Sequence, residues 1–440
     1  MNRCPNTLMM MLAVAVGQLA ANAAANRTVD DEARTAELLR QVEAMETEVA
    51  SLQAERGAGW LTDARTEEVR SIVHDVLSDA ESRASLLQDV ATSGWDEHLF
   101  LASPDGDFKI EVEGLIQVRY VFNFQDETNP DDANRGGFEN SRTKLAFTGH
   151  VLDPTWTYMV RGDFETDGGT MRLEEAYIAK QLDDGWAIRV GQFKGPFLRE
   201  ELVESWNQLA ADRSMVNERF TQNFMQGVEV SWLDDIWRIT AMLSDGIDEA
   251  NSPWNAYDTE YALTGRVEVR LMGEWESFPA LLGRPDMEDA LMLGGAIHHQ
   301  KAEFGTPAGP EDEAAMLAVE GNFLSGPFSM FAAFADEDTD FTDSNPWGVV
   351  LQGGYWLTEE WQVYGRFEYG DPDVANEEEL MVLTAGVNFF FSPGMRWTTD
   401  LGYGLNEVTS TWAAPIVGWR EDPSGEDGQV TVRTQLQLSF

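Results

Sequence analysis

The sequence has very little cysteine and few basic residues. Cys4 is the only cysteine among 440 residues, and it lies in an N-terminal segment that we expect to be removed. The remaining chain can then form no disulfide and carries no thiol chemistry. Thirty lysines and arginines stand against 77 aspartates and glutamates, which gives a formal net charge of −47. We therefore expect no nucleic-acid partner, because phosphate backbones are bound by lysine and arginine.

Long apolar runs are also missing. Beyond the N-terminus, no segment approaches the run of about 18 apolar residues that marks a transmembrane helix. The mean hydropathy of −0.32 is typical of a soluble protein. This value is still compatible with a membrane barrel, since only alternate residues of a barrel strand face lipid.

Signatures of catalysis are absent as well. The sequence contains no Gly-x-Ser-x-Gly elbow, no P-loop and no His-Glu-x-x-His. Neighbours on a strand point to opposite faces, so the pair His298 and His299 is not expected to chelate one metal ion. The other histidines are scattered along the chain, at His74, His98 and His150. We predict that the protein is not an enzyme and has no catalytic residues, no metal site and no cofactor.

Residues 1–25 have the layout of a cleaved secretory signal peptide. One basic residue, Arg3, precedes an apolar stretch from Leu8 to Leu19, and small alanines follow. The apolar stretch is too short to span a membrane. The chain is therefore predicted to be exported.

Residues 26–90 follow a helical pattern. Apolar residues spaced by four, three, four and three positions form a short coiled-coil seam at Leu38, Val42, Met45, Val49 and Leu52. We interpret this segment as an oligomerising periplasmic stalk. The alternative is a lone amphipathic helix that lies on the following domain. Residues 91–106 are predicted to be a linker.

The end of the chain has the pattern of a membrane strand. Apolar and polar residues alternate there, and the apolar face carries Val430, Val432, Leu436, Leu438 and Phe440. A strand of about 10 residues spans a bilayer when it is tilted. A final strand that ends on phenylalanine is typical of the closing strand of a bacterial outer-membrane barrel.

The same period of two runs through residues 107–440. We predict sixteen strands, near 107–124, 139–150, 155–166, 170–181, 186–194, 225–233, 236–244, 259–272, 290–300, 314–324, 327–335, 347–357, 360–370, 380–391, 395–405 and 429–440. Their connections mostly alternate between short and long, which is the plan of an outer-membrane barrel. Two connections break this rule: 167–169 is short where a long loop is expected, and 273–289 is long where a short turn is expected.

Aromatic residues support a face that contacts lipid. Trp156, Tyr158 and Phe164 share one phase of their strand. Such residues near strand ends form the aromatic girdles at the membrane interfaces. A soluble β-sandwich is the alternative, and sixteen alternating strands after a signal peptide disfavour it. The predicted fold is therefore all-β, a 16-stranded antiparallel transmembrane β-barrel preceded by a short N-terminal coiled-coil helix.

One segment of the chain carries a family resemblance. Residues 191–197 read Gly-Gln-Phe-Lys-Gly-Pro-Phe, followed by Glu-Glu-Leu at 200–202 and Asp-Arg-Ser at 212–214. This order resembles the phosphate-selective porin O and P family, and the resemblance extends over the barrel in strand order, spacing and the terminal phenylalanine. It implies a homotrimer of sixteen-stranded barrels in which the loop after this strand folds inward and narrows the pore.

The resemblance also implies basic residues at the constriction. By position, Lys194 and Arg213 are the candidates, and Arg199 and Arg219 lie in the same loop without matching a motif position. A long loop that folds into a barrel wide enough for water must occlude part of its lumen.

Basic residues are concentrated in the first part of the predicted barrel, where 13 of the 30 lie between residues 101 and 220. Strand phase places seven of them on the lumen wall of neighbouring strands: Arg119, Arg142, Lys144, Arg161, Arg172, Lys180 and Arg189. They are expected to form a basic strip. The alternative is that they pair with inward carboxylates such as Asp163 and Glu174.

These observations predict a porin of the cell outer membrane for passive diffusion of small anions, with phosphate as one candidate. Its other expected partners are the lipid and lipopolysaccharide of that membrane. Acidic clusters near 126–132, 311–313, 336–340 and 377–379 repel anions and attract cations at the loop-side mouth. A general or cation-selective porin is therefore an alternative. A second alternative is a structural tether that links the membrane to the cell wall through the stalk.

Overall fold

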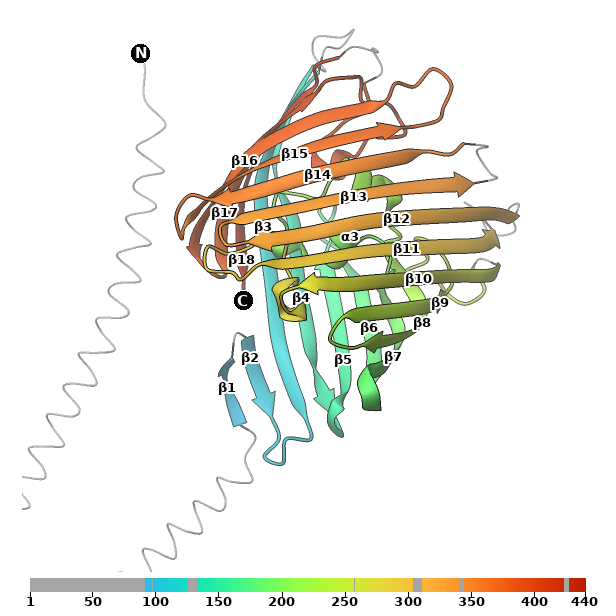
Figure 1. Cartoon of the computed structure of the whole chain (residues 1–440), viewed down its shortest axis with the longest axis vertical. Helices are drawn as coiled ribbons and strands as arrows, with labels where there is room; N and C mark the ends of the chain where they lie inside the picture. Colours follow the sequence, from blue (N-terminus) through green and yellow to red (C-terminus); the bar gives the residue numbers. More distant parts are fainter. Residues whose placement is uncertain are drawn as a thin grey trace, which may run out of the picture. The chain divides into compact units, whose positions relative to one another are not determined.

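The computed structural model describes residues 92–96, 98–125, 133–256, 258–303, 311–339, 344–422 and 427–440 (Figure 1). The predicted signal peptide and stalk, and the acidic cluster at 126–132, lie outside these residues. Within them, no helix is long and apolar enough to cross a membrane. Part of the predicted linker is instead a hairpin of β1 (Thr92–Asp96) and β2 (His98–Ala102).

Sixteen further strands of the described residues form an antiparallel sheet in which each strand pairs with the next. Their bounds are β3 (Lys109–Phe124), β4 (Asn134–Val151), β5 (Asp153–Phe164), β6 (Met171–Gln181), β7 (Trp186–Lys194), β8 (Phe224–Leu233), β9 (Trp237–Ser244), β10 (Thr259–Met272), β11 (Ala290–Glu303), β12 (Glu311–Ser325), β13 (Phe328–Thr339), β14 (Trp347–Trp356), β15 (Trp361–Asp371), β16 (Leu380–Ser392), β17 (Met395–Gly404) and β18 (Val430–Ser439). The last strand pairs with the first, with Val430 opposite Phe124 and Ser439 opposite Leu115. The sheet is therefore a closed barrel, as predicted.

The alternation in the sequence becomes an outer and an inner face. On β18, Leu436 and Leu438 are each more than 40 % exposed on the outer face. Thr431, Gln435 and Gln437 face inward and are buried. The barrel thus presents apolar side chains outward and buries polar ones inside, which suits a lipid environment.

The last residue extends the pairing that closes the barrel. Phe440 donates its N–H to the carbonyl of Gly114 at 3.0 Å, and Gly114 donates to the carbonyl of Phe440 at 2.7 Å. The Phe440 ring covers Gly114 so closely that a Cβ atom there would lie 2.3 Å from it. Only glycine fits at this position.

Connections differ in length at the two ends of the barrel. Leu152 alone joins β4 to β5, and Gly326 and Pro327 join β12 to β13 at the same, short-turn end. Residues 195–223 and 405–429 are long connections at the opposite, long-loop end. The short helices within the connections are α3 (Arg199–Leu202), α4 (Met215–Phe220) and 3₁₀ turns at Asp183–Gly185, Ser205–Asn207, Trp275–Ser277 and Pro415–Val417.

Residues 195–223 form an inward loop, and an apolar core lies between it and half of the barrel wall. Phe197, Leu209, Val216 and Phe220 of the loop belong to this core. The wall side is made by small and apolar residues of β11–β16: Ala296, Met316, Ala318, Phe331, Ala333, Ala335, Val350, Tyr364, Leu380 and Val382. Residues 408–419 contribute further side chains, including Trp412. The inward loop is therefore packed against one half of the wall.

The long connection 273–289, at the short-turn end, also folds inward. Its Leu281 and Leu282 are part of the same apolar core. Leu281 donates its N–H to the carbonyl of Asn207 in the inward loop at 3.1 Å. Gln362 of β15 donates to the carbonyl of Leu282 at 2.6 Å. The unexpected length of this connection thus corresponds to a segment that enters the barrel from the other end.

Replacement of Gly114 by valine should weaken closure of the barrel. The side chain would collide with the Phe440 ring, and overpacking of this kind costs about 1–3 kcal/mol. The unfolding temperature should fall, as measured by the heat-dependent mobility shift of the folded barrel on gels. Gly137→Val is the matched control, because a Cβ atom at Gly137 meets nothing within 4 Å. Equal unfolding temperatures for the two variants would show that the Phe440 contact does not support closure.

Candidate channel interior

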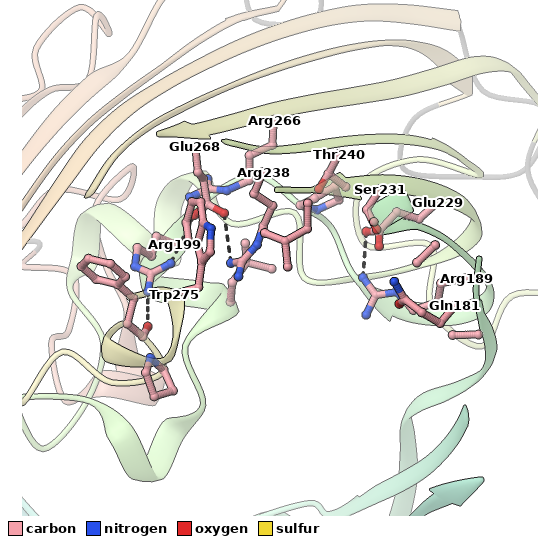
Figure 2. Close-up of a pocket in the computed structure, with 18 of the residues that line it drawn as sticks. Gln181, Arg189, Arg199, Glu229, Ser231, Arg238, Thr240, Arg266, Glu268 and Trp275 are labelled. Carbon is pink, nitrogen blue, oxygen red and sulfur yellow. Dashed lines mark hydrogen bonds and ion pairs between the residues drawn. The ribbon is translucent and has the colours of Figure 1, made fainter. Parts of the chain in front are cut away.

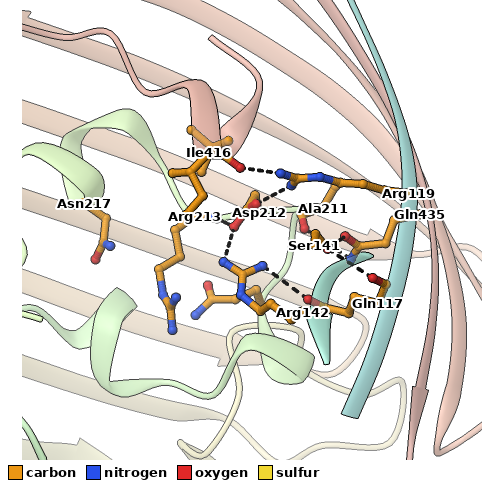
Figure 3. A network of polar contacts seen from close by, with 12 residues as sticks. Gln117, Arg119, Ser141, Arg142, Ala211, Asp212, Arg213, Asn217, Ile416 and Gln435 are labelled. Atoms are coloured by element: carbon orange, nitrogen blue, oxygen red, sulfur yellow. Dashed lines mark hydrogen bonds and ion pairs between the residues drawn. The ribbon is translucent and has the colours of Figure 1, made fainter. Parts of the chain in front are cut away.

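The inward loop is fixed to the polar half of the wall through Asp212. Arg142 of β4 donates from Nη2 to Asp212 Oδ1 at 2.8 Å, and Arg119 of β3 pairs with Oδ2 (Figure 3). Burial alone would raise the pKa of Asp212, but these two guanidinium groups hold it well below its usual range. The carboxylate is therefore charged and serves as the anchor between loop and wall.

A second anchor joins the loop to β5 and β7. Lys194 donates from Nζ to the carbonyl of Glu201 at 2.8 Å and lies 3.8 Å from Glu204 Oε2. Arg161 donates from Nη1 to Glu204 at 2.8 Å and to Glu175 at 2.7 Å. Burial would raise the pKa of Glu204, but Lys194 and Arg161 lower it to about 2. The positive charges of Lys194 and Arg161 are therefore balanced in part by the Glu204 carboxylate of the loop that they anchor.

Arg213 acts within the loop itself. Its Nε donates to the carbonyl of Glu200 at 3.2 Å, and its Nη2 donates to the carbonyls of Glu201 and Val203 at 3.3 Å each. The same guanidinium pairs with the Glu201 carboxylate at 3.2 Å. Arg213 thus fixes the fold of the loop backbone.

Wall carboxylates bind amides of the loop backbone. Glu320 of β12 accepts the N–H of Arg199 at 2.9 Å, and Glu368 of β15 accepts the N–H of Met215 at 2.7 Å. These amides would otherwise be buried without partners, which is costly. The inward acids of the second half of the barrel therefore support the loop as the arginines of the first half do.

A pocket of about 560 Å³ lies between the inward loop and β6–β10, towards the short-turn end (Figure 2). Glu268 on its wall pairs with Arg266 at 2.8 Å, Arg199 at 3.2 Å and Arg238 at 3.3 Å. Glu320 supplies a second carboxylate, to Arg266. Three guanidinium groups are therefore in direct contact with two carboxylates, and Glu276 is a further carboxylate on the pocket lining.

Arg238 is the most accessible member of this arginine cluster (Arg199, Arg238 and Arg266). Its side chain is 35 % exposed, and its guanidinium lies 4.5 Å from the ring centre of Trp275. Arg189 lines the same pocket but pairs with Glu229 at 2.7 Å. Arg238 and Arg266 were not predicted as site residues, although strand phase would have placed both on the inner wall. The prediction concentrated on the first half of the barrel, where basic residues are more numerous.

A second pocket, of about 370 Å³, lies between α4 and residues 411–416 on the long-loop side. Glu218 and Arg219 line it, and Arg219 Nη2 forms an ion pair with Glu337 Oε2 at 2.6 Å. Burial, with the negative charges of Asp212 and Glu201, raises the pKa of Glu218 to about 7. A carboxyl group that changes charge near neutral pH therefore lies on this side of the inward loop.

The predicted wall residues mostly lie where strand phase placed them, but as ion pairs. Arg119, Arg142, Arg161 and Arg189 face inward with the acidic partners described above, and Lys144 lies 2.6 Å from Glu174. Arg172 is exposed at the long-loop end of β6 and makes no ion pair with any residue that the structure describes. The wall is thus closer to the paired alternative than to a free basic strip.

Lys180 was predicted on the lumen wall, and this placement is wrong. Register places Glu175 opposite Arg161 and Leu173 opposite Gly162, so β6 carries one extra residue, Glu174. Such a bulge moves every later side chain to the other face. Lys180 therefore shares the outer face with exposed Ile178, and its Nζ lies 4.8 Å from the ring centre of Trp156.

The neighbouring histidines of β11 point to opposite faces, as predicted. His298 is buried inside, with Nδ1 2.9 Å from Thr264 Oγ1. His299 is stacked on Tyr261, with ring centres 5.4 Å apart. In the part of the chain that the structure describes, no three histidine, cysteine, aspartate or glutamate residues are grouped to hold a metal ion.

A comparison with known families agrees with the fold: the sequence profile of phosphate-selective porin O and P matches residues 110–411. The chain belongs to this family. It is a porin of the outer membrane, and its barrel is a channel. A search of curated proteins finds no match to the chain.

Solved structures agree in fold. The anion-selective porin from Comamonas acidovorans has a TM-score of 0.54 at 12 % identity, over 75 % of this chain and 99 % of that one. The trimer form of OmpT from Vibrio cholerae has a TM-score of 0.51 at 12 % identity, over 75 % and 99 %. OmpF of Salmonella typhi, in complex with daunomycin, gives 0.51 at 12 %, over 76 % and 98 %. At these identities the likeness concerns the fold alone.

Replacement of Asp212 by asparagine should loosen the inward loop. It leaves Arg142 buried without its carboxylate and removes one of the two carboxylates of Arg119, which keeps Glu139. Loss of one partner from a buried ion pair costs about 3–5 kcal/mol. Single-channel recordings in planar bilayers should show a larger or noisier current than the parent protein. Asp183→Asn, in an exposed turn, is the control. Identical traces for both variants would mean that the anchor does not restrain the loop.

The Glu218 carboxyl should make ion preference depend on pH. Because its pKa is about 7, it is neutral below that pH and negative above it. The chloride-to-potassium permeability ratio should therefore fall as pH rises through neutrality. Glu218→Gln should abolish this step, whereas Glu359→Gln, in an exposed turn, should retain it. A step that persists in Glu218→Gln would assign the titration to another group.

Proposed function

We propose that this porin conducts small anions by passive diffusion, with phosphate among the candidate solutes. The observation that carries the proposal is the arginine cluster in the short-turn pocket, where three guanidinium groups are in contact with Glu268 and Glu320. In a narrow, partly dehydrated passage, a single charge shifts ion preference by on the order of 1–3 kcal/mol. The close grouping of three guanidinium groups favours anions at this point of the path, and Glu276 on the same lining reduces the effect.

Within this proposal the predicted constriction residues have different roles. Arg199 and Arg219 line the two pockets on either side of the inward loop and meet the solute. Lys194 and Arg213 are buried in contacts to the loop and set the width of the passage. Arg172, exposed at the long-loop end of β6, attracts anions at that end. Because most other basic residues are paired, we expect the anion preference to be modest.

Assembly and chemistry complete the proposal. We propose a homotrimer, since OmpT of Vibrio cholerae, which has a similar barrel, is solved in a trimer form. Diffusion through a lumen needs no catalytic group, so we propose no enzymatic role. Phospholipid and lipopolysaccharide are the proposed neighbours of the outer face.

A cation-selective or general porin is the second candidate, and a specific observation favours it. A pocket of about 490 Å³ on the outer face of the long-loop rim is lined by Asp336, Glu337 and Asp338 together with Phe334 and Trp347, and the whole chain carries a net charge of −47. Carboxylates at a mouth concentrate cations there. A tether role would depend on the predicted stalk, which lies outside the described residues.

Reversal potential across a KCl gradient in planar bilayers distinguishes the two candidates. The proposal predicts an anion preference that falls when Arg238 is replaced by glutamate, most strongly at low salt, where screening is weakest. Lys180→Glu is the matched control, because it changes the charge equally on the outer face of the same side of the barrel. A cation preference in the parent protein would support the alternative, and equal ratios for the two variants would remove Arg238 from the ion path.

A further inference from the structure

The hairpin of β1 and β2 extends the barrel sheet past the end of the chain. On one edge of β3, β18 pairs with residues 115–124, and β2 pairs with residues 109–112 of the same edge. Figure 1 shows both short strands beside the lower part of β3. The hairpin therefore occupies the position that β18 leaves free beyond Phe440.

The pairing register shows which face of the hairpin continues the outer face of the barrel. Leu99 lies opposite Val112 and Leu101 opposite Ile110, so they share the face of these β3 residues. Residues 110 and 112 have the same phase as Ile116 and Val118, which are each 39 % exposed on the outer face. The intervening Leu115 and Gln117 face inward and are buried. The leucines of β2 thus continue the outer, lipid-facing surface of the barrel.

The first strand adds a tryptophan to the same face. Trp95 lies opposite Leu99 across the hairpin. Trp95 is 65 % exposed, and Leu99 and Leu101 are 50 % exposed each. We call these three residues the hairpin patch. Hydrophobic side chains this exposed, in a short strand pair, indicate a surface that is covered in the working protein.

The opposite face of the hairpin has a different chemistry. Phe100 lies on it beneath the ammonium group of Lys109, which is 5.1 Å from the ring centre. Lys109 also pairs with Glu111 at 2.6 Å. The charged side chains of β3 therefore lie on one side of the hairpin, and the hairpin patch lies on the other. Residue alternation over only five positions per strand is enough to produce this division.

We propose that the hairpin patch inserts into the interfacial layer of the phospholipid leaflet on the short-turn side of the barrel. The patch continues the lipid-facing surface without a break in register. It lies just beyond Phe440, at the edge of that surface, and tryptophan favours the boundary between the acyl chains and the headgroups. The hairpin thus anchors the start of the barrel domain to the membrane surface.

Spin labels on single cysteines test this proposal in the full chain. Cys4 is replaced by serine, and a nitroxide is attached at Leu101→Cys or, on the charged face, at Ala102→Cys. The proteins are reconstituted in phosphatidylcholine vesicles, and accessibility to oxygen and to a water-soluble nickel chelate is measured by power saturation. Leu438→Cys, on the lipid-facing surface of β18, provides the reference for full lipid exposure.

The expected result is oxygen-dominated relaxation at position 101 and chelate-dominated relaxation at position 102. Leu99→Cys repeats the measurement on the same face as position 101. It replaces Leu101→Cys if that variant does not fold. Chelate-dominated relaxation at both 99 and 101 would overturn the proposal. Broadening of the spectrum that disappears when labelled chains are diluted with unlabelled ones would also overturn it, because the patch would then face a second copy of the chain.

Discussion

The organisation of this barrel depends on one constraint: a loop that enters the lumen must bring a partner for every charge and backbone amide that it buries. Asp212 meets this condition with two arginines from β3 and β4, and Glu204 meets it with Arg161 and Lys194. Pairs of this kind contribute little net stability when intact but are costly to break. Their value here is that they define one position of the loop.

The two halves of the barrel wall stabilise the inward loop with different sets of groups. The first half supplies mainly cations to the loop. The second half supplies the guanidinium groups of Arg366 and Arg396, carboxylates for the loop amides, and a layer of small apolar side chains against which α4 packs. Most inward charges are paired in this support, so we propose that ion preference depends on the few that are not. Three guanidinium groups are in contact with two carboxylates around Glu268. On the other side of the inward loop, the Glu218 carboxyl changes charge near neutral pH.

Much of the fold could be predicted, because each strand separates lipid from the barrel interior. Apolar and polar residues must therefore alternate along the strand with a period of two. The number of strands followed from that pattern, and the inward loop was implied by the family resemblance that the motif around Lys194 carries. What could not be predicted depends on single-residue geometry or on pairing. One extra residue at Glu174 reversed the face of Lys180, and nothing in the alternation marks it. The pairing of Arg119 and Arg142 with Asp212 needs a loop conformation that strand phase does not determine, and the hairpin at 92–102 is too short for its period to be distinguished from a linker.

The connection 273–289 meets the inward loop from the opposite rim, where Leu281 and Asn207 share a hydrogen bond. The two segments together form a strut across the lumen whose ends are fixed to different rims. A consequence concerns sequence divergence among related channels. Loops that end in solvent can gain or lose residues freely, but a segment that forms half of a strut cannot change length unless the other half compensates. Length changes at 195–223 and at 273–289 should therefore occur together, while the outer loops vary independently.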